Sequence, residues 1–428
     1  MLERPGSPLL LDKRHARKGL AEAVNIPETS VFYNLEVAAR RFPAKTAIQF
    51  FGASTSYAQL LSDVERIAGY LQQVCGVKRG DRVLVISQNC PQFIAAYFAI
   101  LRADACFVPV NAMLLEDEVR HIANDSGAVA AFVAEELMPQ VVPLLADTPL
   151  SHVIVHAYAD ALGDDDAGLL VPNWLRARSP DAAWPTGVAR WQAALDSNRS
   201  PGPHLAGPDD LCMLPYTSGT TGAPKACVHT HGTVTSSLVA ATLWRRVNAE
   251  STFLAVAPLF HLLGLAHVNT AIYAGSTIVL LPRWDREAVA ILLERHRVTF
   301  WAALPAMLVD FFDQPGIEER DFSCLTMVTG GGAATPQHVA EILQQRYGLD
   351  YIEGYGMTET ASFLCANPLH KPKQLCLGVP TFGVDLRLVD PLTLAPVRRG
   401  RSASSWYTPR RSCLATGIIR RPMPRVSW

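Results

Sequence analysis

The chain has 428 residues, of which 49% are hydrophobic and 18% charged, and its formal net charge is −1 at pH 7. This length exceeds one ordinary hydrophobic core, so two or more subdomains are expected. A net charge close to zero, without a basic run that interleaves with aromatic residues, argues against a nucleic-acid partner. The nine cysteines include no Cys-x-x-Cys pair, which favours reduced thiols over a disulfide or zinc framework.

The N-terminal residues lack the basic and then apolar pattern of a secretory signal, so a cytoplasmic protein is expected. In the first half of the chain, short apolar runs alternate with helical patterns. Ser56-x-x-Gln59 resembles a helix capping box, and apolar residues recur at helical spacing over 60–71. Strands are predicted over 82–87, 105–110 and 128–133, with a helix over 91–102. This alternation predicts a parallel sheet with helices on both faces.

The segment 214–225 reads Leu-Pro-Tyr-Thr-Ser-Gly-Thr-Thr-Gly-Ala-Pro-Lys and has the composition of a phosphate-binding loop. Its two glycines allow consecutive backbone N–H groups to face one anion, while hydroxyls and one lysine add further donors. An ordinary P-loop would place the lysine directly after its last glycine and a Ser or Thr after the lysine. Here Lys225 stands three residues after Gly222 and Ala226 follows, so a GTPase-like switch is excluded. A polar surface loop is the remaining alternative.

Beyond this loop, the apolar stretch 253–281 is interrupted by Pro258, His261, His267 and Asn269. It therefore predicts buried core and no membrane span. Contact with a membrane surface and the oligomeric state stay open. Strands over 277–281 and 325–329, with a helix over 286–296, predict a second sheet.

Three more motifs follow in order, at 258–261 (Pro-Leu-Phe-His), 329–334 (Thr-Gly-Gly-Gly-Ala-Ala) and 351–359 (Tyr-Ile-Glu-Gly-Tyr-Gly-Met-Thr-Glu). Together with the loop they resemble the signature motifs of the adenylate-forming superfamily, which includes acyl-CoA synthetases, luciferases of the firefly type and adenylation domains of peptide synthetases. The likeness covers about 27–400 and leaves 1–26 as an N-terminal extension. It implies an α/β fold, the large N-terminal domain of that superfamily, with two doubly wound sheets plus a smaller distorted barrel.

The resemblance also implies a reaction and a set of site residues. A carboxylate would attack the α-phosphorus of ATP to give an acyl adenylate and pyrophosphate, and the thiol of CoA would then displace AMP. The residues expected to hold the β- and γ-phosphates are Thr217, Ser218, Gly219, Thr220, Thr221, Gly222 and Lys225. Those expected around AMP are Gly331, Gly332, Ala333, Glu353, Gly354, Tyr355, Gly356, Met357 and Thr358. Lys225, Thr358, Glu359 and His261 would be catalytic, with Mg²⁺ bound by the carboxylate of Glu359.

His261 stands among leucines and a phenylalanine, where a histidine is ordinarily a core residue. In the superfamily the matching histidine lies between the acyl pocket and the thiol tunnel. The form Pro-Leu-Phe-His is typical of acyl-CoA synthetases, whereas peptide synthetases carry an aspartate-based pattern there. His261, Trp301 and Leu304 are expected to line an apolar pocket. A medium- or long-chain fatty acid is the first substrate prediction, and an aryl acid is the second.

The tail 401–428 departs from the superfamily's pattern. It holds six arginines, five serines, three prolines, two tryptophans and no acidic residue, and shows neither strand alternation nor a helical period. A basic tail that is disordered or binds a membrane surface is one interpretation. We prefer a frameshift after Gly400, because a back-translation of Arg401 to Trp406 with codons such as AGG TCG GCG AGC TCG TGG, with one G restored in front, reads Glu-Val-Gly-Glu-Leu-Val.

That restored reading is the continuation expected in the superfamily. The frameshift hypothesis leaves the barrel incomplete and the C-terminal, lysine-bearing domain absent. A catalytically disabled nucleotide-binding remnant is therefore the alternative to an active ligase.

Overall fold

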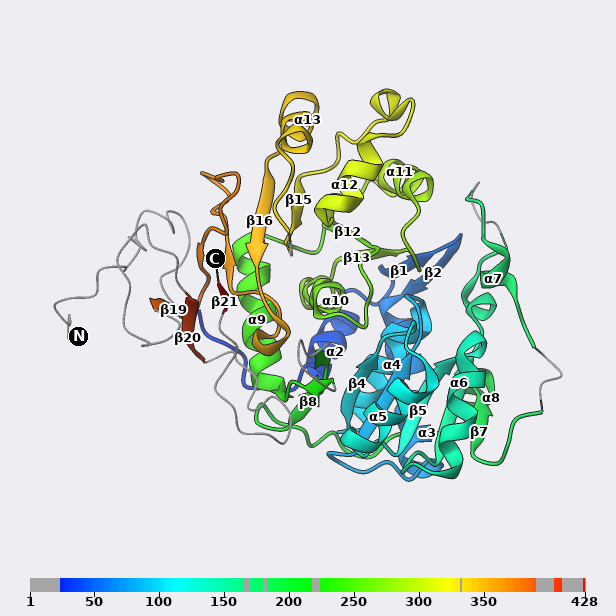
Figure 1. The fold of residues 1–428 in the computed structure, drawn as a ribbon. Helices are drawn as coiled ribbons and strands as arrows, with labels where there is room; N and C mark the ends of the chain where they lie inside the picture. Colours follow the sequence, from blue (N-terminus) through cyan, green and yellow to red (C-terminus); the bar gives the residue numbers. More distant parts are fainter. Residues whose placement is uncertain are drawn as a thin grey trace.

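The computed structural model describes residues 24–164, 169–179, 183–217, 224–331, 333–389, 404–409 and 426–427. Within these residues, two large sheets are stacked, with helices between them and on their outer faces (Figure 1). The expected α/β architecture is confirmed. Most of the expected N-terminal extension lies outside the described residues.

The first sheet has the strand order β11-β8-β4-β3-β5-β6-β7, and only the β11–β8 pair is antiparallel. Its strands are β3 (Arg82–Ile86), β4 (Cys106–Val110), β5 (Ala130–Ala134), β6 (His152–His156), β7 (Val188–Arg190), β8 (Leu211–Met213) and β11 (His229–Thr230). The three strands predicted in the first half lie at its centre. The predicted helix is α4 (Pro91–Arg102), whose bounds agree with the sequence pattern.

The second sheet has the order β18-β17-β16-β15-β14-β12-β13-β1-β2 and is parallel from β16 to β1. Its strands are β1 (Thr46–Phe50), β2 (Ala53–Ser56), β12 (Thr252–Ala255), β13 (Thr277–Leu280), β14 (Phe300–Ala302), β15 (Met327–Gly330), β16 (Tyr351–Tyr355), β17 (Cys365–Ala366) and β18 (Val379–Pro380). The sequence alternation did not reveal β1 and β2, which come early in the chain yet pair with this later sheet.

The helices form three layers around the two sheets (Figure 1). Between the sheets lie α2 (Phe32–Arg41), α4 and α10 (Leu262–Ala274), and α9 (His231–Arg245) packs beside α10. The outer face of the first sheet carries α5 (Glu116–Ser126) and α6 (Met138–Val141). Beyond the second sheet lie α11 (Arg286–Arg295), α12 (Pro305–Phe312) and α13 (Gln337–Tyr347). The predicted core stretch 253–281 becomes β12, α10 and β13, and no described helix is long and apolar enough to cross a membrane.

Two short helices and α3 (Tyr57–Gln73) complete the first half; the short ones are α7 (Asn173–Arg176) and α8 (Trp191–Asp196). The capping-box prediction for α3 is half right. Ser56 accepts a hydrogen bond from the backbone N–H of Gln59 at 3.1 Å. The Gln59 side chain, however, donates to Asp63 one turn ahead, because an exposed amide finds a carboxylate partner at i+4.

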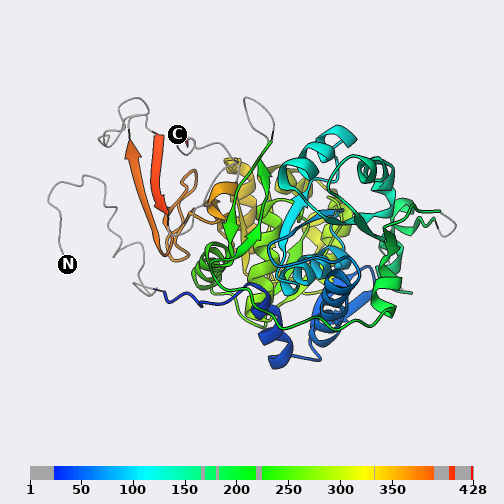
Figure 2. The same ribbon diagram turned by 90° about the horizontal axis from the view of Figure 1, so that it is seen from below.

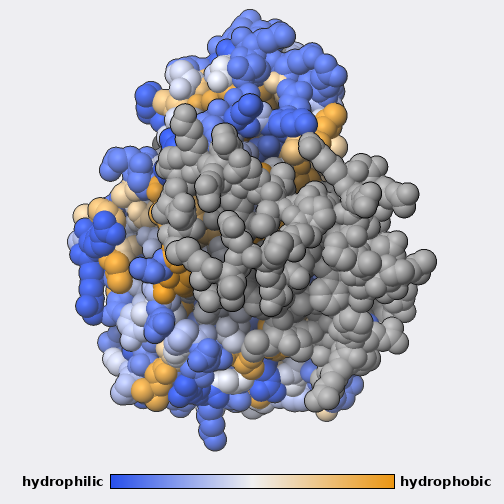
Figure 3. All heavy atoms as spheres, turned by 90° about the vertical axis from the view of Figure 1, so that its left-hand side faces the viewer, coloured by the Kyte–Doolittle hydropathy of each residue, from blue (hydrophilic) through white to orange (hydrophobic). Residues whose placement is uncertain are grey.

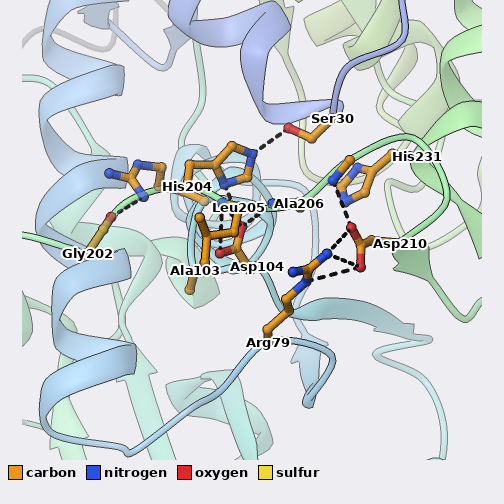
Figure 4. Close-up of polar contacts among 12 residues, drawn as sticks. Ser30, Arg79, Ala103, Asp104, Gly202, His204, Leu205, Ala206, Asp210 and His231 are labelled. Atoms are coloured by element: carbon orange, nitrogen blue, oxygen red, sulfur yellow. Dashed lines mark hydrogen bonds and ion pairs between the residues drawn. The ribbon is translucent and has the colours of Figure 1, made fainter.

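A buried polar cluster ties the segment before α2 to the first sheet (Figure 4). Oγ of Ser30 lies 2.6 Å from Nε2 of His204, and Nδ1 of His204 lies 2.7 Å from Oδ1 of Asp104. The Asp104 carboxylate also accepts hydrogen bonds from the backbone N–H groups of Leu205 and Ala206. One carboxylate at the end of α4 thus fixes two separate chain segments.

The remaining strands form small sheets. Antiparallel β19 (Val384–Val389) and β20 (Ser404–Pro409), with β21 (Val426–Ser427), lie to one side of the two large sheets (Figure 2). The tail shows no strand alternation in its sequence, yet 404–409 form a strand. Trp406, Tyr407 and Thr408 favour extended backbone, and β19 supplies a pairing edge. On this side of the molecule the described surface is mostly hydrophilic, with scattered apolar patches (Figure 3).

Candidate functional site

A cavity of about 300 Å³ opens at the carboxyl ends of four neighbouring parallel strands of the second sheet. Its walls include His261 after β12, Leu304 after β14, Gly330 and Gly331 at β15, and the residues that follow β16. β12 has β13 on one side and β14 on the other, so the chain changes its winding direction there. Ligands of open parallel sheets bind at such a switch point.

The turn after β16 brings four predicted AMP residues to the cavity wall: Tyr355, Gly356, Met357 and Thr358. Gly356 is required sterically, because a Cβ at this position would lie 1.3 Å from the carbonyl oxygen of Ser362. The Thr360 hydroxyl accepts a hydrogen bond from the N–H of Met357 at 3.1 Å and closes the turn Thr358–Thr360. The chain therefore folds back tightly enough for Thr358 to reach the cavity.

The glycine turn after β15 forms the adjacent wall. A Cβ on Gly331 would lie 2.3 Å from the carbonyl oxygen of Gly354, so the two backbones touch at the cavity edge. Glu353 is buried behind them, and its carboxylate accepts hydrogen bonds from the N–H groups of Thr335 at 3.2 Å and Cys376 at 3.0 Å. Glu353 thus supports the wall from behind. Ala333 is exposed beside the turn, and Gly332 lies outside the described residues.

The predicted phosphate loop is held at both ends. Thr217 in β9 (Tyr216–Thr217) pairs with Lys225 in antiparallel β10 (Lys225–Ala226), so the two ends of the loop are neighbours. The hydroxyl of Tyr216 donates to Asp125 of α5 at 2.6 Å and anchors this hairpin stem. Five predicted residues, Ser218, Gly219, Thr220, Thr221 and Gly222, lie outside the described residues.

His229 connects the segment after the loop to the turn after β16, and the sequence motifs did not single it out. Its Nε2 lies 2.7 Å from the carbonyl oxygen of Thr358, and its Nδ1 lies 3.3 Å from the Thr233 hydroxyl. Burial lowers the pKa of His229 to about 4, so the ring is neutral at pH 7. A carbonyl can only accept, so Nε2 carries the proton. The only sequence signal was a histidine four residues beyond Lys225.

Of the three residues expected to line an apolar pocket, His261 and Leu304 line this cavity, and Trp301 is not among its lining residues. His261 directly precedes α10 and makes no side-chain capping hydrogen bond; it is exposed, lines the cavity, and desolvation lowers its pKa. Trp301 packs against Trp284 and Phe311, because successive side chains of β14 point to opposite faces of the sheet. Its neighbour Phe300 faces α10 and contacts the ring of His267.

Glu359, the predicted metal ligand, is partly buried in the turn that carries Thr358. Among the described residues, no three His, Cys, Asp or Glu side chains gather as a metal site. The described cysteines are all free thiols. A metal at Glu359 would therefore need most of its oxygen ligands from elsewhere.

Residues 35–404 match the family model of the AMP-binding enzymes, so the chain belongs to that family. The chain is 27% identical to the long-chain-fatty-acid–CoA ligase of Bacillus subtilis (strain 168), over 83% of this chain and 64% of that protein. It is 33% identical to the feruloyl-CoA synthase of an Amycolatopsis species, over 82% of this chain and 65% of that protein. The chain thus spans 64% and 65% of the length of these two curated relatives.

The fold is also that of a solved N-terminal domain. The inhibitor-bound N-terminal domain of FACL13 from Mycobacterium tuberculosis superposes with a TM-score of 0.75 at 24% sequence identity, over 91% of this chain and 92% of that one. The described residues therefore have the fold of the large N-terminal domain of adenylate-forming enzymes, as the motifs predicted.

Proposed function

We propose that this chain is an acid:CoA ligase that activates a carboxylic acid with ATP and transfers the acyl group to CoA. The observation that carries the proposal is the cavity at the switch point, which His261, Tyr355 and Thr358 line together with Gly331. Names of the relatives support the same chemistry, since one is a fatty-acid–CoA ligase and another a feruloyl-CoA synthase. A fatty acid of medium or long chain is the first candidate substrate, and an aryl acid the second.

In the proposed reaction an oxygen of the carboxylate attacks the α-phosphorus of ATP, and the bond to pyrophosphate breaks. The protein's part is to position anions and spread their charge. Lys225 would follow the departing pyrophosphate, and the Thr358 hydroxyl would donate to the α-phosphate. In the second step the CoA sulfur attacks the acyl carbon and AMP leaves, with His261 between the acyl and thiol groups.

Glu359 fits a role as the single protein ligand of Mg²⁺. This ion commonly takes one or two carboxylates and completes its shell with water and substrate phosphates. When bound, the ion would neutralise phosphate charge.

The test is binding and turnover with the purified chain. Calorimetry with acyl-sulfamoyl adenosines, which imitate acyl adenylates, is expected to give saturable binding that Thr358→Val weakens. Mass spectrometry after incubation with ATP, Mg²⁺, CoA and a panel of acids is expected to find acyl-CoA. If the chain neither binds these analogues nor forms any acyl-CoA, the proposal fails.

A second candidate, a nucleotide-binding remnant with little catalysis, is favoured by the composition of 401–428. This arginine-rich segment has no acidic residue and departs from the superfamily's pattern. Saturable binding of the analogues without acyl-CoA formation would favour this candidate. A cytoplasmic location and the absence of a nucleic-acid partner stay part of the proposal.

A further inference from the structure

Arg245 is a buried cation that faces the cavity. It is the last residue of α9, only 9% exposed, and lies among the residues that line the cavity. Its Cζ atom lies 4.4 Å from the ring centroid of Phe363 and 5.7 Å from that of Phe300. Within the part of the chain that the structure describes, no carboxylate, carbonyl or hydroxyl accepts a hydrogen bond from its guanidinium.

Ring contacts leave this guanidinium incompletely satisfied. A cation over an aromatic face gains some attraction, but its N–H groups still need acceptors when water is removed. Burial lowers the pKa of Arg245 to about 10, so the group keeps its charge at pH 7. An acceptor supplied by a ligand would remove this cost.

His267 presents a hydrogen-bond acceptor beside the donors of Arg245. It is 4% exposed, lines the same cavity, and packs its ring against Phe300 at a centroid distance of 5.6 Å. Its Nδ1 lies 2.6 Å from the carbonyl oxygen of Leu263, so Nδ1 carries the proton of the neutral ring. Nε2 is then a buried acceptor, and no described residue donates to it. Burial, followed by the nearby Arg245, lowers the pKa of His267 to about 3, which keeps this lone pair free.

The backbones of the two residues lie away from the turn that carries Thr358, although both side chains line the same cavity as that turn. His229, just before α9, contacts Thr358, whereas Arg245 ends this helix of 15 residues, which is about 22 Å long. Along α10, His267 lies six residues beyond His261, or about 9 Å deeper. A carboxylate that reacts beside Thr358 and His261 would therefore send the rest of its molecule toward Arg245 and His267.

We propose that Arg245 and His267 bind a hydroxyl group at the end of the substrate remote from its reacting carboxylate. A hydroxyl can accept from the guanidinium and donate to Nε2 at once, which neither a methyl group nor a second carboxylate can do. This inference rests on the proposed function, since it assigns the acid that the same cavity would take. Both an ω-hydroxy alkyl acid and a hydroxyaryl acid carry this group, and their lengths differ.

The experiment measures binding of matched acyl-sulfamoyl adenosines to the full chain by calorimetry. One pair carries 8-hydroxyoctanoyl and octanoyl groups, and the other 4-hydroxycinnamoyl and cinnamoyl groups. In at least one pair the hydroxylated analogue is expected to bind about tenfold to a hundredfold more tightly, as for a hydrogen bond to a charged group. A larger preference in the octanoyl pair would identify an ω-hydroxy alkyl acid as the substrate, and a larger preference in the cinnamoyl pair a hydroxyaryl acid.

Variants link this preference to the two residues. Arg245→Met and His267→Phe are expected to remove most of the preference while the unsubstituted analogues still bind, whereas Arg245→Lys keeps part of it. Arg246→Met is the matched control, because Arg246 is the neighbouring arginine and is exposed. Thermal melting of each variant identifies any that fails to fold. If Arg245→Met fails to fold, the preference for the hydroxylated analogue is compared between Arg245→Lys and the unchanged chain.

Three results would overturn the inference. Equal binding within both pairs would show that the cavity has no hydroxyl site, while binding itself would still support the adenylate site. Tighter binding of an analogue that ends in a second carboxylate would show that the pair recognises an anion. Absence of binding by all analogues would overturn the inference, and absence of acyl-CoA formation as well would reject the proposed function.

Discussion

At the scale of single residues, the position of Thr358 depends on one hydrogen bond from a distant segment. His229 comes from the strand that follows the phosphate loop, and its Nε2 meets the Thr358 carbonyl at 2.7 Å. Because the segments are 129 residues apart, this contact couples the two halves of the candidate site. His229 is a positioning residue for Thr358 and Glu359.

We predict that His229→Leu weakens binding of an acyl-sulfamoyl adenosine about tenfold, which is the worth of one typical hydrogen bond. His229→Gln keeps a donor near the position of Nε2 and should restore most of the affinity. Leucine at His338, an exposed histidine on α13, is the control and should bind like the unchanged chain. Equal loss with Gln and with Leu would point to packing and would refute the positioning role.

At the scale of elements, the Asp104 carboxylate joins the end of α4 to the loop that carries His204. Burial alone would raise the pKa of Asp104, but the contact with His204 and the N–H groups of Leu205 and Ala206 lower it overall. A carboxyl whose folded pKa is lowered stabilises the fold above its unfolded pKa, and this contribution disappears as the pH falls through the folded value. Acid should therefore weaken this junction.

Asp104→Asn tests the charge without disturbing the backbone. Asp104 has φ +60°, a left-handed conformation that asparagine tolerates. We predict a loss of about 2–4 kcal/mol in the free energy of unfolding at pH 7, because hydrogen bonds to a buried charge are lost. In urea titrations from pH 7 downward, the difference from the unchanged chain should shrink once the pH falls below about 4. A difference independent of pH would contradict the electrostatic account.

Elements built from local patterns were predictable from the sequence, and those built from distant partners were not. The bounds of α4 followed from an N-terminal proline and continuous apolar residues. By contrast, β1 joins β13 across more than two hundred residues, and no local pattern reports such a pairing. The site shows the same division. Gly356 and Thr358 stood inside a motif, whereas Arg245, His229 and His267 became visible only when α9 and α10 packed against the strands.

At the scale of the whole molecule, β20 bears on the origin of the tail. The chain pairs Ser404–Pro409 with β19, although serines and a proline are poor strand residues. With one base restored before codon 401, the same six positions read Glu-Leu-Val-Val-His-Ser. Leucine and two valines would then replace Ser405, Trp406 and Tyr407. Both readings contain residues that favour strands, so the frameshift hypothesis preserves the strand.

We predict that the gene carries a one-base deletion at this point and that the restored frame encodes a family-like continuation. If the frameshift hypothesis holds, the restored protein is expected to form acyl adenylate faster than the 428-residue chain. Pyrophosphate release with ATP, Mg²⁺ and the acid panel measures both proteins side by side. DNA that holds no such continuation in any frame, or equal rates for the two proteins, would reject the frameshift and leave 401–428 as a native tail.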